Sequence, residues 1–139
     1  MTPFDLELIT RSAGGLDPDP FATSFYDTLF ELAPPARTLF PADLSDQRSK
    51  LMAELSTLIG FATAATEGDV DRFVARAHRL GARHTAYGAA PEHYDIVGVA
   101  LLAALRDHVA DWSDDHETAW TLLYQLVATT MLEGATLSA

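Results

Sequence analysis

The sequence contains no cysteine and a single lysine. Without cysteine the chain cannot form a disulfide, a thiolate metal site or a thiol nucleophile. Nine basic residues stand against 20 acidic ones, which leaves a net charge of −11 at pH 7. A nucleic-acid surface needs clustered Lys and Arg to neutralise phosphates, so this balance argues against nucleic-acid binding.

Long hydrophobic runs are also missing. The longest, Ile96 to Leu105, has ten residues, whereas a membrane-spanning helix needs about 20. The N-terminal stretch, Met1 to Glu7, has neither the basic start nor the apolar core of a signal peptide. We therefore expect no membrane insertion and a cytoplasmic location.

The chain does contain enough apolar material for one core. Its 139 residues are 48% hydrophobic, and charged residues are spread along its length. This size and composition predict a single globular domain over residues 1–139, with no linker and no internal repeat.

Helical periodicity runs through nearly the whole chain, and no segment of any length alternates as a strand does. Proline, glycine and capping residues mark the ends of the expected helices. Seven helices, one of them very short, predict an all-α fold. Their boundaries are Thr2-Pro3 to Gly14-Gly15, Asp19-Pro20 to Pro34-Pro35, a short piece from there to Phe40, Ser45 to a break at Glu67-Gly68-Asp69, the next from that break to Tyr87-Gly88, Pro91 to about Ala110, and Ser113 onward.

His84 is the most informative side chain, because it continues the apolar stripe of its helix one turn after Leu80. A neutral imidazole nitrogen is a strong ligand for haem iron. On the stripe alone, a core histidine with backbone partners is the more common explanation. No two histidines have the four-residue spacing of a helical metal site, and we expect His93, His108 and His116 to face solvent near helix ends.

Three further polar side chains have apolar neighbours. Tyr26, beside Phe25, could present a buried hydroxyl to a ligand or be an ordinary core tyrosine. Gln47 and Leu51 are one helical turn apart and could line one cavity, although a first-turn glutamine commonly faces water. Tyr94 begins its helix and could reach back across the corner towards His84, or it could only pack.

Arginine recurs every three or four residues along the helix that carries His84, at Arg72, Arg76, Arg79 and Arg83. The simplest explanation is the solvated face of an amphipathic helix, and we favour it for Arg72 and Arg76. Arg83, adjacent to His84, could instead pair with a haem propionate.

Several short motifs occur together along about residues 20 to 130, and in that order they resemble a bacterial globin. The resemblance is specifically to the globin domain of flavohaemoglobins and to their single-domain relatives. It implies a globin fold of about seven helices around a haem b pocket. The motifs are Phe25-Tyr26-Asp27 with Leu29-Phe30, Leu39-Phe40, Asp46-Gln47-Arg48 with Leu51, Arg83-His84-Thr85, Pro91 to Gly98, Leu101-Leu102, Ala119-Trp120 and Tyr124.

The resemblance also assigns roles around the cofactor. On the proximal side His84 is similar to the residue that binds the iron, and Tyr94 to the tyrosine that orients its imidazole. Phe40 resembles the corner aromatic that packs on the haem face. Contacts to the haem are further expected from Leu80, Arg83 and Val97.

On the distal side Tyr26 resembles the tyrosine whose hydroxyl donates to bound oxygen. Gln47 and Leu51 are similar to the polar and apolar walls of that pocket. The sequence departs from the family on the proximal side, where an acidic residue is expected on the last helix. Ala135 occupies that position, and Glu133 faces about 200° away on a helix. Without the acid, His84 should push less electron density onto the iron.

The leading hypothesis is therefore an oxygen-transport globin that binds O2 reversibly at ferrous iron, and NO and CO as well. The second is a nitric oxide dioxygenase, which detoxifies NO by converting NO and O2 to nitrate. Because the chain ends at Ala139, we expect no reductase domain, and this enzyme would need a separate flavin-dependent reductase. A haem-free regulatory module is the third, and the joint presence of His84, Phe40 and Tyr26 speaks against it. The protein is expected to be a monomer or a homodimer.

Overall fold

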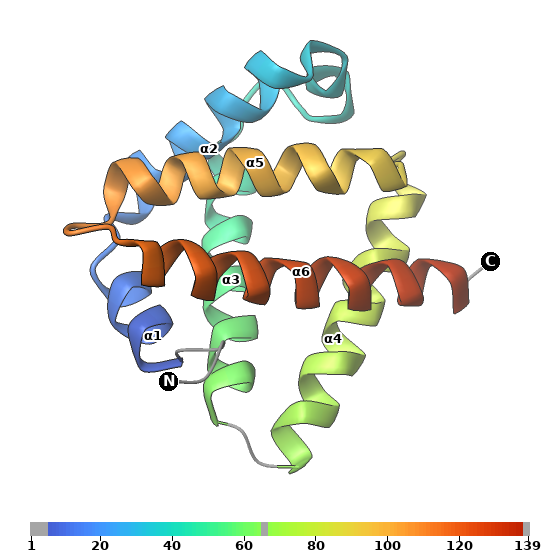
Figure 1. Ribbon diagram of the computed structural model, residues 1–139. Helices are drawn as coiled ribbons and strands as arrows, with labels where there is room; N and C mark the ends of the chain where they lie inside the picture. Colours follow the sequence, from blue (N-terminus) through green and yellow to red (C-terminus); the bar gives the residue numbers. More distant parts are fainter. Residues whose placement is uncertain (1–5, 65–66, 138–139) are drawn as a thin grey trace.

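The computed structural model describes residues 6–64 and 67–137, and every regular element within them is a helix. This confirms the expected all-α fold with one very short member (Figure 1). No helix in the described ranges is long and apolar enough to cross a membrane. The elements are α1 (Leu6–Gly14), α2 (Pro18–Leu32), the 3-10 helix η1 (Pro34–Leu39), α3 (Ser45–Ala64), α4 (Glu67–Ala86), α5 (Pro91–His108) and α6 (Asp114–Leu137).

Proline and glycine mark helix ends at positions that the sequence predicted. The 3-10 helix begins at Pro34 and α5 begins at Pro91, each with proline in the first helical position, where its missing N–H costs nothing. Gly88 follows the end of α4 with a φ of 100°. That left-handed conformation favours glycine and turns the chain towards α5.

Two predicted boundaries were wrong. The second helix begins at Pro18 rather than at Asp19-Pro20, because Asp17 occupies the N-cap position and Pro18 the first turn. Glu67-Gly68-Asp69 does not break a helix but forms the first turn of α4. An acidic residue such as Asp69 is favourable there because the first turn is the positive end of the helix dipole. The expected start at Thr2-Pro3 lies outside the described residues.

Histidines expected to face solvent instead take part in helix capping. The Nδ1 atom of His93 accepts from the Ala90 N–H at 2.9 Å, at the start of α5. At the start of α6, Nδ1 of His116 accepts from the Ser113 N–H at 3.1 Å, and His116 is buried. Each bond satisfies a backbone donor that the helix itself leaves unpaired.

The helices α5 and α6 lie side by side, run in opposite directions and form the front of the molecule in Figure 1. Behind them α2 packs on α5, α4 packs on α6, and α3 contacts both α2 and α4. The main core lies among these elements, and its largest fully buried side chains are Trp120, Phe21, Ile9 and Leu105. The indole N–H of Trp120 donates to the Ser12 hydroxyl at 3.0 Å, which ties α6 to α1.

The helix that carries His84 approaches α6 closely at two glycines. A Cβ atom on Gly81 of α4 would collide with the backbone of Met131 in α6. A Cβ atom on Gly134 of α6 would collide with the backbone of His78 in α4. The crossing therefore requires glycine on both helices, and it sets the position of α4 less than one turn before His84.

A polar contact holds the other side of α4. The Arg76 guanidinium donates two hydrogen bonds to the Glu54 carboxylate of α3, at 2.6 and 2.9 Å. Paired bonds of this kind fix orientation as well as distance. The two contacts together place α4 between α3 and α6.

We predict that Gly81→Ala lowers the free energy of unfolding by about 2 kcal/mol or more, because the added methyl group must displace the α6 backbone. Gly60→Ala is the matched control, since Gly60 also lies in a helix and a Cβ there meets nothing within 4 Å. That substitution should stabilise by about 0.5–1 kcal/mol. Urea unfolding of both variants measures the difference, and equal effects would contradict the close crossing.

Candidate functional site

His84 lies in the last turn of α4 with an exposed imidazole. Its Nδ1 atom is 2.7 Å from the carbonyl oxygen of Leu80, one turn earlier on the same helix. A carbonyl oxygen can only accept, so Nδ1 is the donor and carries the proton. In the neutral ring Nε2 then keeps its lone pair and is available as a ligand.

This contact also restricts how the imidazole can turn. Histidines that bind metals commonly donate their second N–H to a carbonyl or carboxylate, which fixes the tautomer and the ring orientation. Here the Leu80 carbonyl is that acceptor. The Leu80 side chain is buried in the cluster that includes Phe73, Ala77 and Met131, so the acceptor itself is held firmly.

Tyr26 is buried in α2 among aromatic rings. Its ring centroid lies 5.7 Å from that of Phe40 and 6.0 Å from that of Phe30. Burial raises the pKa of the Tyr26 phenol to about 12, so the hydroxyl keeps its proton at neutral pH and can donate. It currently donates to the backbone carbonyl of Gln47 at 3.4 Å, a long and therefore weak bond.

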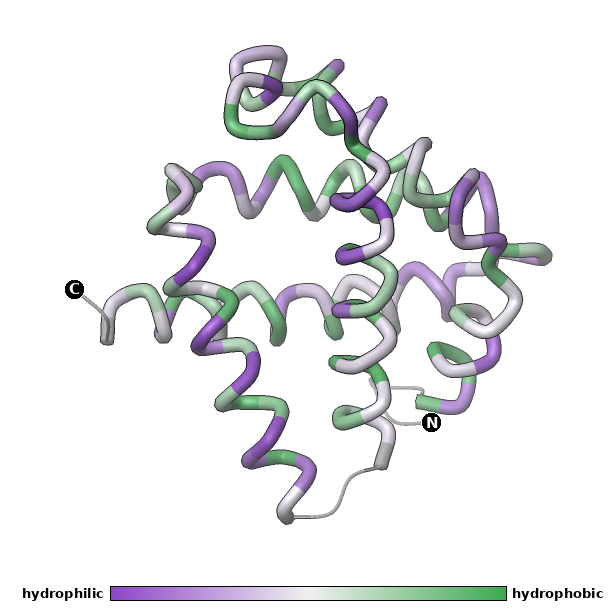
Figure 2. Tube along the Cα trace, turned by 180° about the vertical axis from the view of Figure 1, so that it is seen from behind, coloured by the Kyte–Doolittle hydropathy of each residue, from purple (hydrophilic) through white to green (hydrophobic). Residues whose placement is uncertain are grey.

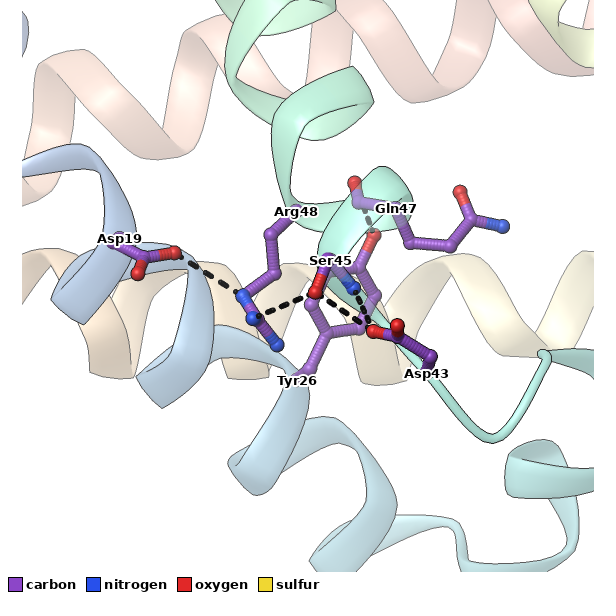
Figure 3. A network of polar contacts seen from close by, with 6 residues as sticks. All are labelled: Asp19, Tyr26, Asp43, Ser45, Gln47 and Arg48. Carbon is purple, nitrogen blue, oxygen red and sulfur yellow. Dashed lines mark hydrogen bonds and ion pairs between the residues drawn. The ribbon is translucent and has the colours of Figure 1, made fainter.

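The start of α3 provides the other part of this region (Figure 3). The Asp43 carboxylate accepts from the backbone N–H of Ser45 at 2.9 Å and from its hydroxyl at 2.7 Å, which holds the pKa of Asp43 below its ordinary value. Figure 3 shows the Gln47 side chain extending away from the Tyr26 hydroxyl. It is thus the Gln47 backbone, and not its amide, that contacts Tyr26.

Partly buried apolar side chains from several elements pack against the core cluster that contains Tyr26. Phe40, Leu51 and Val97 come from the segment after η1, from α3 and from α5, and all three pack against the core cluster that contains Tyr26. Each is only partly buried, so each keeps an apolar surface that the protein itself does not cover. Exposed apolar surface of this kind is what a flat apolar ligand would cover.

Tyr94 lies in the first turn of α5, in the same buried cluster as Leu80. Its hydroxyl is buried and has no hydrogen-bond partner among the described residues. Burial also raises the pKa of its phenol. No hydrogen bond joins Tyr94 to His84 within the described residues, since Nδ1 of His84 bonds to the Leu80 carbonyl and the Tyr94 hydroxyl has no partner there. The role of Tyr94 beside a bound cofactor stays a prediction.

Tyr124 of α6 holds the backbone at Tyr94. Its hydroxyl donates to the Tyr94 carbonyl at 2.6 Å. Its ring lies so close to α5 that a Cβ atom on Gly98 would stand 2.8 Å from it. Sequence patterns do not reveal this role, because only Gly98, a glycine within a helical run, indicates a close neighbour.

Arg83 is exposed beside His84 and lines a surface groove with Arg76, Arg79 and Ala82. Hydrophilic residues recur along this helix in the rear view of Figure 2. Arg72 pairs with Asp69 on the same helix, as a solvated face would predict, whereas Arg76 is partly buried and pairs with Glu54 of α3. Arg79 and Arg83 form no ion pair within the described residues, so their guanidinium groups are available to an anion.

No ion pair joins His84 to a carboxylate within the described residues. Glu133 is exposed, and its carboxylate lies 3.6 Å from Nε2 of His78 rather than near His84. Ala135 is partly buried and has no polar atom in its side chain. Nδ1 of His84 therefore donates its hydrogen bond to the uncharged Leu80 carbonyl and not to a carboxylate.

Two features of these residues suit a haem. His84 offers an oriented Nε2 atom, and the partly buried faces of Phe40, Leu51 and Val97 offer apolar walls. Tyr26 contacts the Phe40 ring and the Gln47 backbone, and Leu80 and Tyr94 belong to one buried cluster.

Comparison with protein families gives a match to the Globin model over residues 23–131. The chain is 32% identical over 134 residues to a rice protein named anaerobic nitrite reductase NSHB5 (Oryza sativa subsp. indica), covering 91% of this chain and 90% of that one. It is 30% identical over 105 residues to the flavohaemoprotein of Bacillus subtilis, covering 75% of this chain and 26% of that protein.

Among solved structures, a protein from Pseudomonas aeruginosa PAO1 described as structurally highly homologous to human haemoglobin superposes with a TM-score of 0.79. It covers 94% of this chain and 97% of its own, at 23% sequence identity. A likeness at this level of identity supports the fold alone.

In the haem-free protein, we predict that Tyr124→Phe lowers the free energy of unfolding by about 1 kcal/mol, because it removes the hydrogen bond to the Tyr94 carbonyl. Tyr94→Phe is the matched comparison. It removes a buried hydroxyl that has no partner among the described residues, so it should be neutral or stabilising. Thermal unfolding followed by circular dichroism ranks the two variants, and the reverse order would show that the Tyr94 hydroxyl is the one that is bonded.

Proposed function

The chain belongs to the globin family, which implies a haem cofactor, and we propose that it binds O2 reversibly with haem b held by His84. NO and CO are expected as further ligands of the same site. The observation that carries the proposal is the 2.7 Å contact between Nδ1 of His84 and the Leu80 carbonyl. It prepares Nε2 to bind iron in one tautomer and one orientation.

Other residues would hold the cofactor itself. When bound, the haem supplies an iron that takes gaseous ligands reversibly in its ferrous state. Phe40, Leu80 and Val97 offer apolar surface to the macrocycle, and burying it removes that surface from water. Arg83 is placed to pair with a propionate, because it is adjacent to His84 and has no carboxylate partner within the described residues.

On the distal side of the haem, Tyr26 would face the bound ligand, and Gln47 and Leu51 would line the same pocket. A hydroxyl that stays protonated and buried can donate to a ligand that develops negative charge. The present bond from Tyr26 to the Gln47 carbonyl is long, so exchanging it for a better acceptor costs little. The Gln47 amide would need to rotate inward to reach the same ligand.

Nitric oxide dioxygenase activity is the alternative. It is supported by the likeness to a flavohaemoprotein, of which the chain matches 26%, and it would need electrons from a separate reductase. Reversible binding is favoured because Glu133 lies beside His78 and leaves His84 without a carboxylate partner. A neutral acceptor gives the imidazole less basic character than a carboxylate does.

We predict that Tyr26→Phe speeds O2 dissociation from the ferrous protein roughly tenfold to a hundredfold, since the lost hydrogen bond is worth about 1.5–3 kcal/mol. Tyr87→Phe is the control, because Tyr87 is 73% exposed and should leave the rate unchanged. Stopped-flow displacement of O2 by CO measures both rates. An unchanged rate in Tyr26→Phe would remove Tyr26 from the distal site.

The two candidate functions differ in how much nitrate each haem can form. With NO and O2 supplied together and no reductant, we expect the protein to form nitrate once per haem and then to stop. Sustained nitrate formation with a flavin reductase added, at a rate limited by NO supply, would favour the dioxygenase. The rice relative's name points to nitrite as another substrate, and loss of nitrite under anaerobic conditions can be followed in the same preparation.

A further inference from the structure

The corner between η1 and α3 receives hydrogen bonds from one arginine. Residues 40–42 lie between the two helices, so their backbone carbonyls are not paired along a helix. Arg37, in the last turn of η1, donates to all three. Its Nη1 atom donates to the Pro41 carbonyl at 2.8 Å and, more weakly, to the Phe40 carbonyl at 3.3 Å. Its Nη2 atom donates to the Ala42 carbonyl at 2.9 Å.

Capping of the short helix does not explain this pattern. A basic side chain in a last turn commonly bonds the final carbonyls of its own helix. The helix η1 ends at Leu39 with Phe40 as its C-cap, and the two shorter bonds of Arg37 go to residues beyond both. Arg37 also forms no ion pair within the described residues, although the chain contains 20 acidic residues. The polar contacts of its guanidinium group are therefore made with the corner.

The Arg37 side chain also restrains the Phe40 ring through a neighbour. Its guanidinium carbon lies 5.2 Å from the ring centroid of Phe30, within the range of a cation–π contact. The Phe30 ring lies 5.4 Å from that of Phe40, edge to face. Phe40 is thus held at its backbone by a hydrogen bond and at its ring by a side chain that Arg37 contacts.

The other end of the corner is held by a different residue. The Asp43 carboxylate accepts two hydrogen bonds from Ser45, at the start of α3 (Figure 3). Asp43 therefore fixes the junction with α3, and Arg37 fixes the three residues before it. This division makes residues 40–42 the part of the corner that depends on Arg37.

We propose that Arg37 is a positioning residue for the cofactor, because its hydrogen bonds keep the corner in one conformation and so keep the Phe40 ring where it contacts the haem. This inference rests on the proposed function, since it requires a haem in the site to which Phe40 contributes. Phe40 is only partly buried by the protein itself, so part of its surface is available to the cofactor. A corner that opened more often would expose this contact to water and release the haem faster.

The arrangement uses properties that lysine does not have. A guanidinium group is planar and has donors on two terminal nitrogens, so it can bond several carbonyls along one turn. The lysine ammonium is a point charge on a flexible stem, and it also stacks less well on an aromatic ring. Arg37→Lys should therefore keep the charge and only part of the restraint. Arg37→Met keeps an apolar stem and loses every donor.

Hydrogen exchange of the purified chain tests the restraint itself, with or without haem. The Phe40 amide donates to the Arg37 carbonyl at 3.2 Å, so its exchange rate reports how often the corner opens. In Arg37→Met we expect this amide to exchange at least about tenfold faster, while amides in α5 and α6 keep their wild-type rates, because only a local opening changes. Arg11→Met is the matched control, since Arg11 is exposed and pairs with Glu7 within α1.

Two results of this measurement would overturn the restraint. One is a Phe40 amide that exchanges at the wild-type rate in Arg37→Met. The other is an equal acceleration in α5 and α6, which would show a general loss of stability in place of a local one.

Haemin transfer to an excess of apomyoglobin tests the consequence for the cofactor. We expect Arg37→Met to lose haemin about tenfold faster than the wild type, Arg37→Lys to lie between them, and Arg11→Met to match the wild type. Phe40→Leu should also lose haemin faster. Adding Arg37→Met to Phe40→Leu should speed the loss no further, because coupled residues do not contribute independently. Effects that multiply in the double variant would contradict a role of Arg37 through Phe40.

The outcomes separate this inference from the proposed function. If the wild type takes up haemin and His84→Gly does not, an Arg37→Met variant that loses haemin at the wild-type rate overturns the positioning role alone. If the wild type takes up no haemin, the proposed function is wrong, and the role of Arg37 towards a cofactor is wrong with it. Hydrogen exchange then still decides whether Arg37 restrains the corner.

Discussion

The hydrogen bond from the His84 imidazole to the Leu80 carbonyl is the contact on which the functional account depends. It lies within one helical turn, yet its position in space is set by distant parts of the chain. The crossing of α4 and α6 at Gly81 and Gly134 fixes the helix that carries it, and the bonds from Arg76 to Glu54 hold that helix to α3. The proposed iron ligand is thus oriented locally and placed by packing.

The two sides of the candidate site are built by different means. The proximal side relies on hydrogen bonds along and between helices, from His84 to Leu80 and from Tyr124 to Tyr94. The distal side relies on ring packing around Tyr26, and its polar contact to the Gln47 backbone is weak. In the proposed function a firm proximal side would keep an iron in place, whereas the loosely bonded hydroxyl of Tyr26 would change partner when a ligand arrives. That division of roles suits a protein whose ligand must bind and leave.

The helices could be predicted from the sequence, because proline, capping residues and helical periodicity are local signals. The motifs that carry the family resemblance are likewise short and local. His84 was predicted to continue the apolar stripe of Leu80, but its imidazole is exposed, and the stripe could not show that the Leu80 backbone would be the acceptor. Gly81, Gly134 and Tyr124 were missed as structural residues, since each acts on a helix far away in the chain. The start of α2 was misplaced because two prolines, Pro18 and Pro20, both suit a first turn and periodicity does not choose between them. The roles of Gln47 and Arg83 stay predictions, because they depend on a bound cofactor.

The central claim is that Nε2 of His84 binds haem iron, and a haemin titration tests it most directly. Absorption spectra of the wild-type protein and of His84→Gly would be recorded in the ferric, reduced and CO-bound states, with and without added imidazole. We predict a sharp Soret band in the wild type that shifts on reduction and again with CO, and its recovery in His84→Gly only when imidazole fills the space left by the side chain. A wild-type spectrum equal to that of free haemin, or a His84→Gly spectrum equal to the wild type without imidazole, would contradict the assignment.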